Sequence, residues 1–166
     1  AIIESLPAET RENPGVAVFL AEYAMRKDQP AVVTKNAVLA ARSHTNIDRV
    51  RSMFPYLASR EQWQCIADCG SPVAFNEFPC ALIAVEANLR VNRAAAAAEI
   101  LKSAMAKWPN EPRLLSSQYE LAMRGAGDQW EGAFAANLKA SLSRLDADHL
   151  ATYISYSFRL ARPSFS

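Results

Sequence analysis

Residues 97–109 read AAEILKSAMAKWP, and this stretch decides how the chain folds. Ala97 and Ala104 are small, Leu101 between them is large and apolar, and Pro109 closes the segment. Two helices can cross closely only where small side chains let their backbones approach, and a large apolar side chain then fills the remaining groove. The stretch therefore predicts a helix that packs tightly against a neighbour and ends at the proline.

Helix start signals recur towards the N-terminus. Asn13-Pro14 is an N-cap residue followed by a proline suited to a first turn, and it predicts a helix that ends near Lys27. Its apolar stripe follows the three-four spacing of an amphipathic helix: Val16, Phe19, Leu20, Tyr23 and Ala24. Asp28-Gln29-Pro30 opens a second helix, whose narrow apolar face consists of Val33, Ala37, Ala40 and Ala41. These two helices are predicted to form an antiparallel pair.

The next part of the chain contains more helix breakers. Asn46 precedes a third stripe, made of Ile47, Val50, Phe54 and Leu57, in which Pro55 must bend or end the helix. Ser59 and Gln62 have the spacing of a capping box and predict a short helix over 60–69. Its expected buried face consists of Trp63, Ile66 and Ala67. Glycine, proline and asparagine cluster in 70–80, which is the expected irregular connection.

Five more helical stripes follow, over 80–91, 93–108, 112–124, 128–144 and 147–161. The last two are clear, and consist of Trp130, Phe134, Leu138 and Leu142, then Leu150, Tyr153, Ile154 and Phe158. Asp128 and Asp146 stand where N-caps are expected. Helices joined by loops of a few residues must lie antiparallel to their neighbours, so the sequence predicts an all-α fold of helical hairpins.

The spacing Ala97-x3-Leu101-x2-Ala104-x4-Pro109 resembles the second half of a tetratricopeptide repeat. Lys139-Ala140 is similar and lies 36 residues after Ala104, close to the family's period of about 34. A looser copy consists of Leu20-Ala21, Ala24, Ala37 and Ala40, and Gly125-Ala126-Gly127 falls at a turn where the family favours glycine. The resemblance covers about two thirds of the chain and leaves out 47–79. It implies a single domain, 1–166, of antiparallel helical hairpins stacked as an α-solenoid. Because the sequence starts at Ala1 without a Met, we expect it to be a fragment of a longer protein.

That resemblance implies a scaffold for protein–protein interaction, with no enzymatic activity and no cofactor. Stacked hairpins leave a groove along their first helices, which would hold a peptide or partner protein in an assembly or secretion complex. The groove positions expected on this chain are Glu86, Arg90, Arg113, Ser116, Ser117, Glu120 and Arg124. Their mixed charges suit an extended peptide with charged groups, although an ordinary solvated face has the same composition.

Charge and apolar content limit the other classes of partner. Lys plus Arg total 18 and Asp plus Glu total 17, so the formal net charge is +1 and does not indicate nucleic acid. The one basic concentration consists of Arg42, His44, Arg49, Arg51 and Arg60. We interpret it as a solvated face. An acidic protein partner is the first alternative, and a helical-repeat module that binds nucleic acid is the next. No apolar run reaches the roughly 20 residues of a membrane span, and the compartment, cytoplasm or periplasm, stays open.

Residues that could carry chemistry form no familiar constellation. The sequence contains no G-x-S-x-G, H-E-x-x-H or G-x4-G-K-[ST], so an enzyme of unrecognised type is only a further alternative. Cys65 and Cys69 share a helical face with no histidine nearby, which is too few ligands for a structural zinc. They are expected to be small core residues with Cys80, while a Cys69–Cys80 disulfide stays open. His149 is assigned to helix capping with Asp146 and Asp148, and Trp63, Trp108 and Trp130 to the core.

Overall fold

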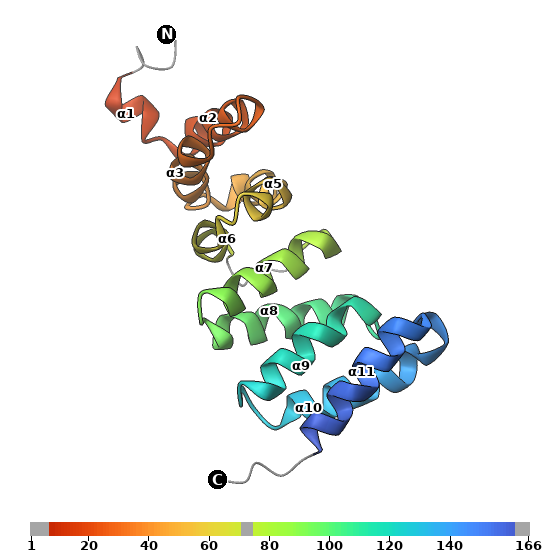
Figure 1. Cartoon of the computed structure of the whole chain (residues 1–166). Helices are drawn as coiled ribbons and strands as arrows, with labels where there is room; N and C mark the ends of the chain where they lie inside the picture. The colour runs from red at the N-terminus through yellow and green to blue at the C-terminus, as the bar shows by residue number, and fades with distance from the viewer. Residues whose placement is uncertain (1–6, 71–74, 162–166) are drawn as a thin grey trace. The chain divides into compact units, whose positions relative to one another are not determined.

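The computed structural model describes residues 7–70 and 75–161, and Figure 1 shows them as helices joined by short turns. Most of these residues are helical and none of them forms a strand, which confirms the predicted all-α fold. Within the same ranges, no helix combines the length and apolar content that crossing a membrane requires.

The chain folds as two compact units that divide between Asn92 and Arg93. We call residues 1–92 unit 1 and residues 93–166 unit 2. The expected irregular connection is partly visible, because no helix occupies Gly70 or 75–77, while 71–74 lie outside the described residues. The boundary between the units falls later, at a turn between two helices. The prediction of a single domain stays a prediction.

Unit 1 is built from α2 and α3 at one end and from α5, α6 and α7 at the other. Its described helices are α1 (Ala8–Arg11), α2 (Pro14–Arg26), α3 (Pro30–Ala40), α4 (Ile47–Arg51), α5 (Phe54–Ser59), α6 (Trp63–Cys69) and α7 (Phe78–Arg90). α2 packs on α3, and α6 contacts α3, α5 and α7. The side chain of Asn13 accepts a 2.8 Å hydrogen bond from the backbone N–H of Gly15, which confirms the predicted cap of α2.

The middle of unit 1 confirms one predicted feature and corrects another. Pro55 ends the helix rather than kinking it, because α4 stops at Arg51 and α5 begins again with the proline in its first turn. The capping box does not form. The hydroxyl of Ser59 instead donates to the carbonyl of Tyr56 at 2.7 Å, and α6 begins only at Trp63, which is half-buried.

Helix-to-helix turns in unit 1 are closed by non-glycine residues with left-handed backbone. Asp28, after α2, has φ 51°, and Glu61, after α5, has φ 55°. In each turn the next N–H reaches back to a carbonyl in the last turn of the helix, from Gln29 to Ala24 at 3.0 Å and from Gln62 to Leu57 at 2.9 Å. This bond satisfies a carbonyl that the helix end would otherwise leave open, so it fixes the reversal of the chain.

The buried face of α2 differs from the predicted stripe. It consists of Ala17, Val18, Leu20, Ala21 and Ala24, whereas Phe19 and Tyr23 are 61% and 50% exposed. α3 matches its prediction at Val33, Ala37 and Ala40. Because α2 and α3 pack through alanines, their backbones lie close together, and the large rings of α2 have no room between them.

Unit 2 contains α8 (Ala94–Lys107), α9 (Leu115–Met123), α10 (Gln129–Ser141) and α11 (Ala147–Leu160), with 3-10 turns at Pro112–Leu114 and Leu142–Arg144. α9 packs on α10 and α11, and α9 and α11 lie side by side in Figure 1. Ala97, Leu101 and Ala104 of α8 are buried, as predicted. The apolar core of α9, α10 and α11 consists of Leu115, Phe134, Leu138 and Tyr153, with Tyr119 stacked on Tyr156 at a centroid distance of 3.9 Å.

The ends of the last two predicted stripes lie outside the core. Trp130, Phe134 and Leu138 of α10 are buried, but Leu142 is 47% exposed. In α11 only Tyr153 is buried, and Ile154 and Phe158 are exposed. Asp128 makes no capping hydrogen bond, whereas Asp146 caps α11 as predicted.

Candidate partner-binding site

The predicted groove residues of unit 2 lie along one side of α9 and of the residues that directly flank it. Arg113, Ser116, Ser117, Glu120 and Arg124 recur at three- and four-residue spacing, and we call this set the α9 face. The opposite side buries Leu114, Gln118 and Leu121. Arg113, Ser116 and Arg124 are exposed, and Ser117 and Glu120 are half-buried. The stripe is therefore polar, of mixed charge and accessible along its length.

Local pairs hold the charged members of the α9 face. Arg124 Nη2 lies 2.5 Å from Glu120 Oε1, one helical turn away. Arg113 Nε donates to Glu111 Oε1 at 2.8 Å, and this hydrogen bond lowers the pKa of the Glu111 carboxyl below its usual value. The hydroxyls of Ser116 and Tyr153 are 3.2 Å apart, which ties the face to α11. Exposed pairs of this kind are worth about 0–1 kcal/mol, so a partner can replace them at small cost.

A shallow cavity of about 290 Å³ opens beside Arg113, between the start of α9 and the start of α11. Its polar lining consists of Glu111, Arg113, Arg144, Asp146 and His149, and its apolar lining of Pro112, Leu145 and Tyr153. Asp146 accepts from the backbone N–H of His149 at 2.9 Å, which lowers the pKa of its carboxyl and confirms the predicted capping role. Charges of both signs thus meet apolar surface at one end of the α9 face.

A buried polar network fixes the turn that carries this cavity. Asn137 of α10 donates to the Gln118 side chain at 3.0 Å and to the Glu111 carbonyl at 3.1 Å. Ser141 donates to the Asn110 carbonyl at 3.2 Å, and Arg144 donates to the same carbonyl. Asn137, Gln118 and Ser141 are all at least 95% buried. Because buried amides are costly unless paired, this network holds Asn110 and Glu111 in one geometry.

The other two predicted groove residues, Glu86 and Arg90, belong to α7 of unit 1. They form an ion pair of 2.8 Å along the helix, and the Arg90 guanidinium lies 4.4 Å from the centre of the Trp63 ring. Trp63 is half-buried, so this ring is not the core residue that the sequence predicted. Glu86 and Arg90 belong to a different unit from the α9 face, and the membership of all seven residues in one groove stays a prediction.

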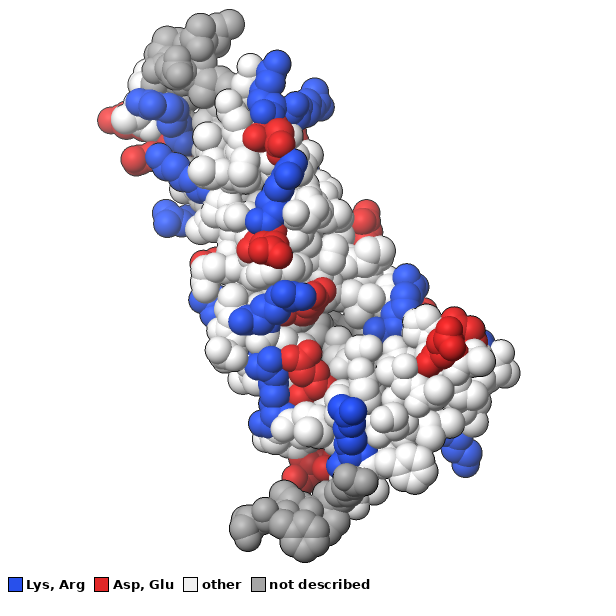
Figure 2. All heavy atoms as spheres, in the orientation of Figure 1, with Lys and Arg blue, Asp and Glu red and all other residues white. Residues whose placement is uncertain are grey.

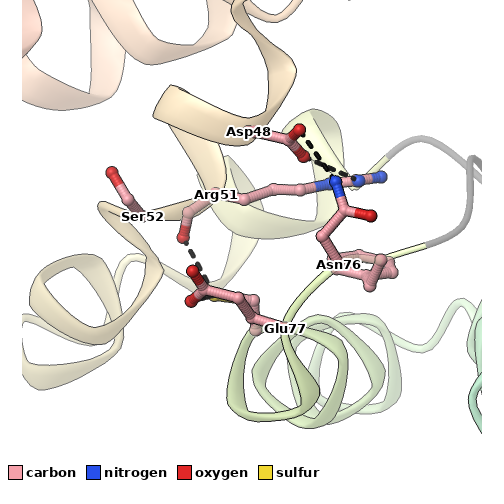
Figure 3. Close-up of a pocket in the computed structure, with 7 residues that line it drawn as sticks. Asp48, Arg51, Ser52, Asn76 and Glu77 are labelled. Atoms are coloured by element: carbon pink, nitrogen blue, oxygen red, sulfur yellow. Dashed lines mark hydrogen bonds and ion pairs between the residues drawn. The ribbon is translucent and has the colours of Figure 1, made fainter.

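The basic concentration of unit 1 is a solvated face at Arg42, His44 and Arg60, as the sequence suggested, but not at Arg51. Arg51 is 97% buried, with its guanidinium 3.9 Å from the Phe75 ring centre and 3.6 Å from Asp48 (Figure 3). Burial lowers the pKa of this guanidinium. Arg49 pairs with Glu22 at 2.6 Å and Arg60 with Asp28 at 2.7 Å. Figure 2 likewise shows both signs of charge interspersed on the visible face.

The cavity around Arg51 has a structural explanation. It measures about 160 Å³, and Figure 3 shows Asp48, Ser52, Asn76 and Glu77 around it. Asn76 donates to Asp48 at 2.9 Å, and the Cys80 thiol donates to the Arg51 carbonyl at 3.4 Å. These contacts pin the start of α7 to α4.

The three cysteines of the chain, Cys65, Cys69 and Cys80, are free and buried, so the Cys69–Cys80 disulfide is not formed. Burial, the largest contribution, raises the pKa of the Cys80 thiol to about 11, which keeps it protonated and unreactive at neutral pH. Over residues 7–70 and 75–161, no three His, Cys, Asp or Glu side chains gather as metal ligands would.

Sequence reasoning missed two features of these surfaces. The Asn137–Gln118–Ser141 network joins the consecutive helices α9 and α10 through side chains that lie beside their apolar stripes, and its only signal was the Asn137, Ser141 pair next to the stripe of α10. The exposure of Phe19 and Tyr23 was signalled by the alanines at 17, 21 and 24, which offer a better face for close helix packing.

Comparison with known proteins found no matching family model, no matching curated sequence and no matching solved structure.

Proposed function

We propose that this chain is a non-enzymatic scaffold that holds a peptide or partner protein, with its helical hairpins stacked in the manner of a tetratricopeptide α-solenoid. The α9 face is the proposed contact surface. The observation that carries the proposal is the continuity of this polar stripe with the cavity at Arg113. A buried hydrogen-bond network holds the cavity, so the surface is arranged before a partner arrives.

The chemistry of the surface favours a peptide with charged groups. Arg113 and Arg124 stand at the two ends of the α9 face, and each can exchange its local carboxylate for a carboxylate of the partner. Pro112, Leu145 and Tyr153 offer apolar contact for a side chain between charged positions. Interfaces commonly combine an apolar centre with a polar rim, and Tyr and Arg are enriched in them.

Replacing Arg113 and Arg124 together with alanine is expected to weaken partner capture about tenfold without unfolding the domain. Proteins retained from the source lysate by the immobilised chain would be identified and quantified by mass spectrometry. Lys139→Ala, which removes an exposed cation from α10, is the matched control and should retain the partner as the parent does. Equal retention by the double variant, or enrichment of RNA instead of protein, would contradict the proposal.

A further inference from the structure

Two large aromatic side chains of unit 1 face solvent beside cations. Phe19 and Tyr23 of α2 are 61% and 50% exposed, and their four-residue spacing places them on one side of the helix. Glu22 and Arg26 belong to the same side, because they lie three residues after each ring. We call Phe19, Glu22, Tyr23, Arg26 and Lys27 the α2 surface.

Helices α4 and α5 border the α2 surface. Arg49 of α4 stacks on Phe19, with 4.2 Å between guanidinium and ring centre, and donates to both oxygens of Glu22 at 2.9 and 2.6 Å. At the other end, Arg60 binds Asp28 at 2.7 Å. The two carboxylates of this region are therefore neutralised, and the Phe19 ring is held in place by a planar cation.

Two further cations remain at the rim. Arg26 and Lys27 are exposed, and neither has a carboxylate partner within residues 7–70 and 75–161. The Lys27 ammonium lies 5.9 Å from the centre of the Tyr23 ring. Because Arg49 offsets Glu22 and Arg60 offsets Asp28, Arg26 and Lys27 give this region a local positive excess. Phe19 and Tyr23 thus form an exposed apolar patch. It is bordered by Arg26 and Lys27, which no carboxylate of the described residues neutralises.

We propose that the α2 surface binds an acidic segment of a partner protein, one that carries a large apolar side chain between carboxylates. The apolar side chain lies on Phe19 and Tyr23, and the carboxylates meet Arg26 and Lys27. Exposed apolar patches with polar rims mark interaction sites, and charge complementarity selects the acidic partner. This surface belongs to unit 1, so the inference does not rest on the α9 face.

Single-stranded nucleic acid fits the α2 surface less well. Base stacking needs an open ring face, and the Arg49 guanidinium already covers one face of Phe19. The carboxylate of Glu22 lies within the surface and that of Asp28 lies directly after Lys27, so both would stand next to phosphates. A peptide can place its carboxylates next to Arg26 and Lys27 and keep them away from Glu22 and Asp28.

Fluorescence anisotropy with the full chain tests the proposal. The probe is a short fluorescein-labelled peptide that alternates Asp with Leu and Phe. Its comparators carry Lys in place of Asp, or Ser in place of Leu and Phe, and an oligouridylate of similar length is the nucleic-acid probe. The acidic apolar peptide should bind about tenfold more tightly than each comparator, and added salt should weaken its binding.

Variants assign the binding to the α2 surface. Phe19→Ser with Tyr23→Ser should reduce affinity about tenfold, and Arg26→Ser with Lys27→Ser should reduce both affinity and salt dependence. Met123→Ser with Leu142→Ser, which removes exposed apolar side chains from unit 2, should change neither. Circular dichroism verifies that each variant stays folded. Unchanged binding by the Phe19→Ser, Tyr23→Ser variant, no binding of the acidic peptide up to millimolar concentration, or preference for oligouridylate would overturn the proposal.

Discussion

Replacing Trp130 with alanine is expected to lower the free energy of unfolding by about 3–5 kcal/mol, the range for removing a buried aromatic ring. Trp130 is 1% exposed and stands at the start of the buried stripe of α10. The loss would leave a void between tightly packed helices, because the helix backbones cannot collapse into it fully. Urea unfolding followed by far-ultraviolet circular dichroism measures the change.

Trp130→Phe is the informative control. The indole N–H of Trp130 is buried, and no acceptor for it is found among the described residues. An unpaired buried donor costs about 1–3 kcal/mol. Phenylalanine removes that donor and keeps most of the ring, so the net change should be smaller than about 1.5 kcal/mol. If Trp130→Ala unfolds at the same urea concentration as the parent, the packing of α10 described here is wrong.

Replacing Asn137 with alanine is expected to cost about 2–4 kcal/mol, because it leaves the Gln118 side-chain carbonyl and the Glu111 backbone carbonyl without their donor. The turn at Asn110 and Glu111 should then loosen. Native-state hydrogen exchange would report faster exchange at Arg113 and Leu114, next to the cavity.

A double variant separates the network from simple loss of volume. In Asn137→Leu the Gln118 amide still lacks its partner, so the variant should be destabilised. Adding Gln118→Leu replaces both partners by apolar groups and should recover part of the loss. Ser143→Ala, at an exposed position of the same unit, should change stability by less than about 0.5 kcal/mol. Additive losses in the double variant would show that the two amides do not act together.

Helix positions could be predicted from the sequence because their signals are local. Asn13-Pro14 marks the start of α2, Asp146 caps α11, and Ala97, Leu101 and Ala104 lie buried in α8. Each of these features depends on residues within one or two turns of helix. The all-α fold follows from their repetition along the chain.

Which face each helix buries was harder to predict, because it depends on the neighbour. Phe19 and Tyr23 fit an amphipathic stripe, yet close packing of α2 on α3 selects the alanine face and leaves both rings outside. Arg51 was expected at the surface because it is charged. It is buried because its guanidinium stacks on the Phe75 ring and pairs with Asp48. The backbone of the turns was not predicted either, since Asp28 and Glu61 take the left-handed conformation that glycine usually supplies.

Photocrosslinking from the α9 face in cells that make the protein tests the proposed scaffold function most directly. A photoreactive phenylalanine analogue at Ser117 should join the chain to a partner protein, and Arg113→Ala with Arg124→Ala should suppress that adduct. The same analogue at Lys139 of α10 should give none. Equal adducts from both positions, adducts to RNA, or no adduct from Ser117 would contradict the account.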